Sequence, residues 1–68
     1  RMKETPFTTM LHAYGVDLMR VPEDATVTGV RGHDGIYVET YCFDSEGQLL
    51  VDDLTGDAIT RNVFHPHP

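Results

Sequence analysis

The sequence predicts an α+β fold, in which one N-terminal helix packs on an antiparallel β-meander of three to four strands. Two patterns along the chain predict it. Apolar residues recur with a helical period before residue 21, whereas apolar and polar residues alternate between glycine-containing turns from residue 26 onward. Between them lies Val21-Pro22, where proline disfavours helical backbone in the preceding residue. A small all-β barrel is the alternative architecture.

The helix is expected to begin at Pro6, because Thr5 is a favourable N-cap and proline is tolerated at the first helical position. Gly15 can adopt the left-handed backbone that ends a helix. The β-branched pair Thr8-Thr9 favours extended backbone, so a strand over residues 7–11 is the competing interpretation. The apolar stripe predicted to face the sheet has the spacing i, i+3, i+4 and i+7 and consists of Phe7, Met10, Leu11 and Tyr14.

Four segments after residue 25 alternate in the manner of strands. The segment over residues 36–43 is the longest and the richest in β-branched and aromatic residues, which predicts the central strand. Turns with glycine separate the segments at 32–35, 44–47 and 53–56. The His-Pro repeat at 65–68 is expected to end pairing and to form a flexible tail. The expected strands are 26–31, 36–43, 48–52 and 58–64.

The chain has 68 residues, which predicts a single small domain over residues 1–68. At this length folding buries only roughly 60% of the surface that the unfolded chain exposes, so the core is small and a homodimer is an open alternative. The single cysteine, Cys42, cannot form a disulfide within the chain, and no apolar run approaches the ~18 residues of a membrane span. We therefore expect a cytoplasmic protein without membrane contact.

No residue pattern predicts catalysis, a cofactor or a metal site. Cys42 is expected to be a buried structural thiol, because it lacks the neighbouring cation that activates a nucleophilic cysteine. Ser45 lies in a turn without the strand-turn-helix context of a hydrolase nucleophile. A calcium loop starting at Asp44 would need glycine at its sixth position, where Leu49 stands. A meander of this size also offers little concave surface for a ligand, so we expect no enzyme.

Acidic residues are concentrated in the middle of the chain. Nine carboxylates lie between residues 23 and 57, against one cation, Arg31, and the net charge of the whole chain is −6. Such a field repels the phosphates of nucleic acids and acidic membranes, and it attracts basic surfaces. The charge therefore favours a basic protein partner over direct binding to nucleic acid.

The two faces of the central strand predict which residues meet that partner. Side chains alternate across a strand, so Tyr37, Glu39 and Tyr41 share one face. Aromatic anchors beside carboxylates are typical of protein interfaces. We predict a small acidic module, an inhibitor or regulator that occludes a basic surface of its partner, including a nucleic-acid-binding one. The predicted partner-binding residues are Tyr37, Glu39, Tyr41, Asp44, Glu46, Asp52 and Asp53.

A second class of function is open. In this alternative the aromatic face of the sheet is buried against copies of the same chain, and the protein is a structural or oligomeric accessory subunit. In size, acidity and lack of catalytic residues the chain is similar to many small accessory proteins encoded by phages and mobile elements. That similarity is one of composition and implies no particular partner.

Overall fold

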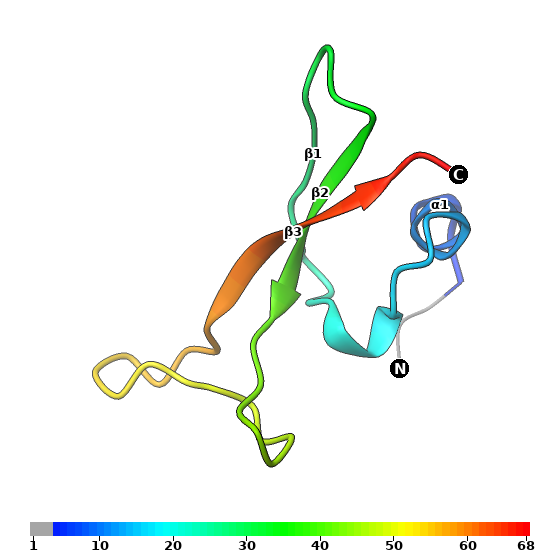
Figure 1. Cartoon of the computed structure of the whole chain (residues 1–68). Helices are drawn as coiled ribbons and strands as arrows, with labels where there is room; N and C mark the ends of the chain where they lie inside the picture. Colours follow the sequence, from blue (N-terminus) through cyan, green and yellow to red (C-terminus); the bar gives the residue numbers. More distant parts are fainter. Residues whose placement is uncertain (1–3) are drawn as a thin grey trace.

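The computed structural model describes residues 4–68, which form one α-helix and a three-stranded antiparallel open sheet. The strand order is β1-β2-β3, with β2 in the centre (Figure 1). The all-β alternative is therefore wrong, and the expected helix and central strand are confirmed. In chain order the elements are α1 (Pro6–Ala13), the 3-10 helix η1 (Leu18–Arg20), β1 (Val27–Gly29), β2 (Gly35–Tyr41) and β3 (Thr60–Pro66).

Local side-chain chemistry sets both ends of α1. The Thr8 N–H donates to Thr5 Oγ1 at 3.2 Å, and the Thr5 N–H donates to Thr8 Oγ1 at 2.8 Å, so the two residues form a reciprocal capping box. Pro6 occupies the first turn, where an N–H is not needed. Gly15 follows the C-cap residue with a φ of 75°, a backbone conformation that other residues rarely adopt. The competing strand over residues 7–11 is wrong.

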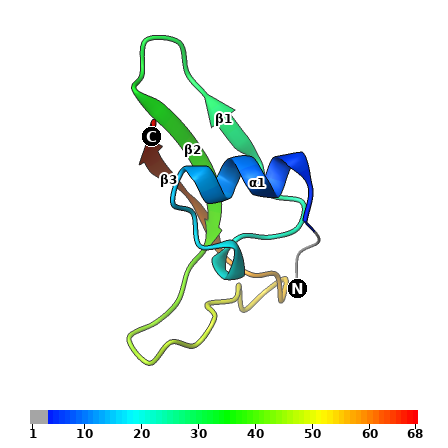
Figure 2. The ribbon, with the colours of Figure 1, turned by 90° about the vertical axis from the view of Figure 1, so that its right-hand side faces the viewer.

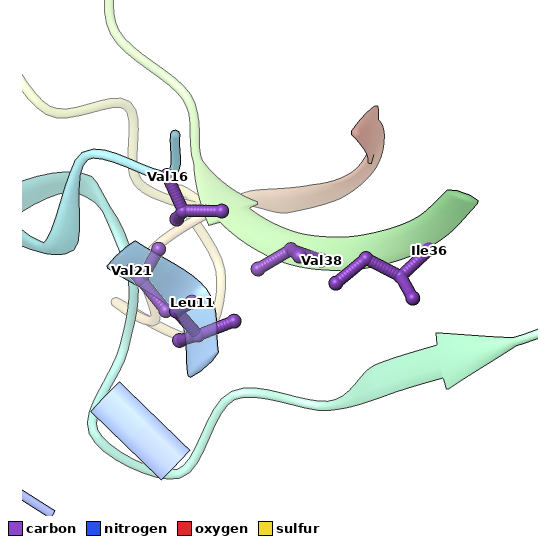
Figure 3. Close-up of a cluster of buried hydrophobic side chains, with 5 residues drawn as sticks. All are labelled: Leu11, Val16, Val21, Ile36 and Val38. Carbon is purple, nitrogen blue, oxygen red and sulfur yellow. The ribbon is translucent and has the colours of Figure 1, made fainter. Parts of the chain in front are cut away.

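A small cluster of buried apolar side chains joins the N-terminal segment to β2. Leu11 and Val38 are fully buried within it. Leu11 comes from α1, which crosses one face of the sheet in Figure 2. Phe7, from the same predicted stripe, remains 37% exposed, so packing of the whole stripe on the sheet is not confirmed. The members of the cluster, drawn in Figure 3, are Leu11, Val16, Val21, Ile36 and Val38.

The register of the sheet gives each of its faces a different character. Paired residues of antiparallel strands share a face, so Val63 lies beside Val38 on the face toward the buried cluster. We call the opposite side the outer face. It carries three cross-strand pairs of β2 and β3, which are Tyr37 with Phe64, Glu39 with Asn62 and Tyr41 with Thr60.

The strand expected over residues 48–52 is not confirmed. The segment makes two isolated bridges, Phe43 with Leu49 and Val51 with Ala58, in place of a continuous ladder. β3 occupies the position beside β2 that a four-stranded meander would give to residues 48–52.

The β2–β3 hairpin splits into two arms at a cycle of three backbone hydrogen bonds. The Cys42 N–H donates to the Ile59 carbonyl at 3.0 Å, and the Ile59 N–H donates to the Leu50 carbonyl at 2.9 Å. The Leu50 N–H closes the cycle on the Cys42 carbonyl at 2.9 Å. Leu50 is thus hydrogen-bonded to both strand ends. The segment between β2 and β3 turns back on itself on either side of this junction, as Figure 1 shows. We call residues 42–59 the forked end, with a first arm at 43–49 and a second arm at 51–58.

Pairing does not end at residue 65 as expected. His65 and Pro66 belong to β3, and the His67 N–H donates to the Asp34 carbonyl at 2.7 Å. The Tyr14 hydroxyl lies 2.8 Å from His67 Nδ1. The C-terminal segment therefore contacts both the β1–β2 turn and the end of α1.

Candidate protein-interaction site

The first arm of the forked end is a tight turn organised by Asp44. Its Oδ1 accepts hydrogen bonds from the N–H groups of Glu46 at 2.8 Å and Gln48 at 2.9 Å. Gly47 has a φ of 80°, and its N–H donates to the Asp44 carbonyl at 3.0 Å. Asp44 therefore holds the turn, as aspartate does at the first position of many turns, while the Glu46 side chain is exposed.

The second arm repeats this arrangement around Asp52. Its Oδ1 accepts from the N–H groups of Thr55 at 3.0 Å and Leu54 at 2.8 Å. Both hydrogen bonds lower the pKa of the Asp52 carboxyl, and the one from Thr55 has the larger effect. Gly56 closes the turn with a φ of 75°, and its N–H donates to the Asp52 carbonyl at 2.8 Å. The turn projects Leu54 into solvent, where 96% of the residue is exposed.

The surface of the forked end mixes apolar side chains with carboxylates. Every residue from 44 to 57 is exposed, and no lysine or arginine occurs between residues 42 and 59. Charges of a single sign beside exposed apolar area are the combination that a basic partner surface can cover. The carboxylates are Asp44, Glu46, Asp52, Asp53 and Asp57, and the exposed large apolar residues are Leu49, Leu50, Val51, Leu54 and Ile59.

Glu39 has a structural role on the outer face of the sheet. Its Oε1 accepts from the Thr26 N–H at 2.9 Å, and its Oε2 accepts from the Thr60 hydroxyl at 2.9 Å. The Thr26 N–H and then the Thr60 hydroxyl lower the pKa of the Glu39 carboxyl, because both stabilise its charged form. Glu39 therefore connects the entry to β1 with the start of β3, and its carboxylate is engaged within the fold.

Tyr37 belongs to an aromatic group at the other end of β2. Its ring meets the ring of Phe64 edge-to-face with centroids 5.2 Å apart, and the His33 ring lies 6.1 Å away. Tyr41 lies next to the forked end, at the last residue of β2. Four residue steps along an extended strand place the two tyrosines about 13 Å apart.

The predicted partner-binding residues do not form one continuous site. Four of them are carboxylates in the forked end, and Tyr41 lies beside them at the end of β2. Tyr37 lies at the far end of β2, and Glu39 lies between the two tyrosines. The prediction omitted the exposed apolar residues of the arms. Leu54 was recognisable in the sequence, because a leucine inside an Asp-Asp-Leu-Thr-Gly turn has no strand or helix in which to be buried. The acidic group in the forked end is Asp44, Glu46, Asp52 and Asp53.

A cleft of about 740 Å³ is lined by the η1 segment, the end of β2, one face of β3 and the first arm of the forked end. The expectation of little concave surface is therefore wrong. Cys42 lines this cleft and is half-buried, so it is less enclosed than expected. Arg20 also lines it, with its guanidinium 4.7 Å from the centroid of the Phe43 ring and Nε 3.4 Å from Asp17 Oδ2. This pairing directs the Arg20 charge toward the chain's own side chains.

Two further features are absent from residues 4–68. No group of three or more His, Cys, Asp or Glu side chains in this range is arranged to hold a metal ion. No helix in the same range has the length and apolar character needed to cross a membrane. Comparison of the whole chain with protein-family models, with curated proteins and with solved structures gave no match.

Proposed function

We propose that this protein is a small acidic interaction module whose forked end binds and occludes a basic surface of a partner protein, as an inhibitor or regulator. One observation carries the proposal. The forked end presents five carboxylates and no lysine or arginine beside five exposed apolar side chains. The carboxylates would steer a basic partner, and the apolar side chains would lose contact with water in the complex.

The internal hydrogen bonds of the arms support this role. The Oδ1 atoms of Asp44 and Asp52 each accept two backbone N–H groups, which restricts the turns before any partner is bound. A surface that is already ordered loses less conformational entropy on binding. Leu54 at the tip of the second arm is the anchor that such a complex would bury.

Electrostatic steering predicts a specific dependence on salt. The Debye length falls from about 10 Å at 0.1 M to about 3 Å at 1 M, so association with a basic partner slows as salt is added. Self-association through an apolar interface between copies of the chain would change little, or become stronger, as salt is added. Salt dependence therefore distinguishes the proposed function from the oligomeric accessory role.

The test uses two matched charge reversals. Glu46→Lys with Asp53→Lys changes the forked end without removing the Oδ1 acceptors of Asp44 and Asp52. Glu23→Lys with Asp24→Lys alters two exposed carboxylates between η1 and β1. Each double variant changes the net charge by the same four units, from −6 to −2.

The wild-type chain is used to recover a partner from its native cells, and the purified partner is then titrated with all three proteins. We expect the Glu46/Asp53 variant to bind at least about 10-fold more weakly, mainly through slower association, and the Glu23/Asp24 variant to bind like the wild type. Equal weakening by both variants would mean that only net charge matters, and the proposed site would be wrong.

A further inference from the structure

The free edge of β3 is the longest unpaired strand edge in the described part of the chain. β3 has seven residues and is hydrogen-bonded to β2 on one side only, whereas the other edge strand, β1, has three. Asn62 is exposed, and Phe64 is 41% exposed. An exposed strand edge is a template for pairing with another strand.

The register shows which backbone groups point outward from this edge. The Glu39 N–H donates to the Thr26 carbonyl, so odd-numbered residues of β2 are directed toward β1 and even-numbered ones toward β3. The hydrogen bond from the Cys42 N–H to the Ile59 carbonyl agrees with this alternation, because Cys42 is an even-numbered residue bonded to the chain just before β3. Within β3 the residues bonded to β2 are therefore Arg61, Val63 and His65, and the N–H and C=O groups directed outward are those of Thr60, Asn62 and Phe64.

β3 carries few of the features that commonly prevent edge pairing. Its pairing with β2 is continuous from Thr60 to Pro66, so no bulge twists the edge away, and proline stands only at the last position. The strand contains no lysine and a single formal charge, Arg61. The edge is thus open to an incoming strand over most of its length.

We propose that β3 pairs antiparallel with β3 of a second copy of this chain, which makes one continuous six-stranded sheet across a two-fold axis. The inference goes beyond the proposed function, because it concerns a surface separate from the forked end. With Asn62 opposite Asn62 of the second copy, Thr60 faces Phe64 of the second copy. Arg61 then faces Val63 of the second copy instead of a like charge. The outward N–H groups of each copy also lie opposite outward C=O groups of the other, so they can form hydrogen bonds.

The chain as a whole exposes more surface than a compact monomer of its size, which is compatible with an interface to a second copy. A compact monomer of this mass exposes about 4,300 Å², whereas this chain exposes 5271 Å². The difference is of the same order as the roughly 800 Å² that each partner buries in a standard interface. The Cα radius of gyration, 12.9 Å, likewise exceeds the about 11 Å of a compact domain of this length. A second copy is also the strand donor that is always present with this chain.

The dimer has a consequence for the forked ends. β3 begins beside the fork and runs away from it, so antiparallel pairing places the two forked ends at opposite ends of the six-stranded sheet. Each copy then remains free to bind a basic partner.

The test combines sedimentation with amide hydrogen exchange of the wild-type chain. We expect a dimer in which the amides of Thr60, Asn62 and Phe64 exchange as slowly as those of Arg61, Val63 and His65. A monomer with alternating protection, slow at 61, 63 and 65 and fast at 60, 62 and 64, would overturn the proposal. A dimer that keeps the alternating pattern would also overturn it, because that dimer would use a face of the sheet instead of the edge.

A pair of variants at Asn62 isolates the outward backbone group. Asn62→Pro removes the outward N–H, and Asn62→Ala removes the same side-chain amide but keeps that N–H. We expect Asn62→Pro to raise the dissociation constant about 30-fold or more, and Asn62→Ala to leave the dimer nearly unchanged. Equal effects of the two variants would contradict edge pairing. If Asn62→Pro does not fold, Asn62→Lys places two like charges opposite one another, and an unweakened dimer would then count against the proposal.

Discussion

Gly35 and Gly29 make a matched pair of positions for a quantitative test of the sheet. Neither has a positive φ, so alanine can adopt the backbone conformation at both. A Cβ added at Gly35 would lie 2.7 Å from Phe64 Cζ and 2.7 Å from Pro66 Cα, and it would overlap the His65 carbonyl oxygen. A Cβ added at Gly29 would meet no atom within 4 Å. The same chemical change is therefore predicted to have opposite effects.

The magnitudes follow from steric and entropic effects. The Phe64 ring can rotate away from a new methyl group, but the backbone atoms of β3 can move only by displacing the strand. Overpacking of this kind costs about 1–3 kcal/mol, and the lower entropy of the unfolded alanine chain offsets roughly 0.4–1 kcal/mol of it. We expect Gly35→Ala to lower the free energy of unfolding by about 1–2 kcal/mol. Gly29→Ala lowers the entropy of the unfolded chain without a steric clash, so we expect it to raise the free energy of unfolding by about 0.4–1 kcal/mol.

Urea denaturation followed by circular dichroism measures both changes. The expected total stability is only on the order of 3–10 kcal/mol for a chain of this length, so differences of this size shift the midpoint clearly. Equal shifts for the two variants, or stabilisation by Gly35→Ala, would refute the close approach of β3 to Gly35 and with it the register of the β2–β3 pair.

Three further predictions concern the core, the helix and pH. Val38→Ala should lower the free energy of unfolding by about 2–3 kcal/mol, because Val38 is fully buried, whereas Val30→Ala, at 41% exposure, should change it by less than about 0.5 kcal/mol in the same urea titration. Thr5→Ala should cost about 1 kcal/mol through loss of the capping box, and reduced helical signal on heating would report it. The pKa of Glu39 is lowered in the folded state, so its contribution to stability is present above its ordinary value of 4.5 and is lost as pH falls through the folded value. The stability difference between wild type and Glu39→Gln should therefore shrink on acidification, and a difference that stays constant with pH would contradict the hydrogen bonds from Thr26 and Thr60.

The parts of the fold that depend on neighbouring residues were predictable from the sequence. The start of α1 follows from the side chains of Thr5 and Pro6, and its end follows from the conformational freedom of Gly15. The two turns of the forked end follow from an aspartate that precedes a glycine by three or four residues. Each of these signals acts within a few residues, so no knowledge of the tertiary structure is needed to read it.

The forked end could not be predicted from such signals. Its cycle of hydrogen bonds joins Cys42, Leu50 and Ile59, which are eight or more residues apart, and alternation within residues 48–52 resembles that of an ordinary strand. The position of Tyr37 relative to the acidic arms depended on this same split of the hairpin. Counting carboxylates also could not show that Glu39 is engaged by Thr26 and Thr60. Charge composition indicated the kind of partner, whereas the arrangement of the site required long-range pairing.

The most direct test of the proposed function is a map of backbone amide shifts when the ¹⁵N-labelled chain is titrated with its purified basic partner. We expect the largest changes within residues 42–59, with Leu54 among them, and little change at the amides of Tyr37 and of the β1–β2 turn. Changes centred on Tyr37 and Phe64, or on the η1 side of the cleft, with a forked end that does not respond, would contradict it.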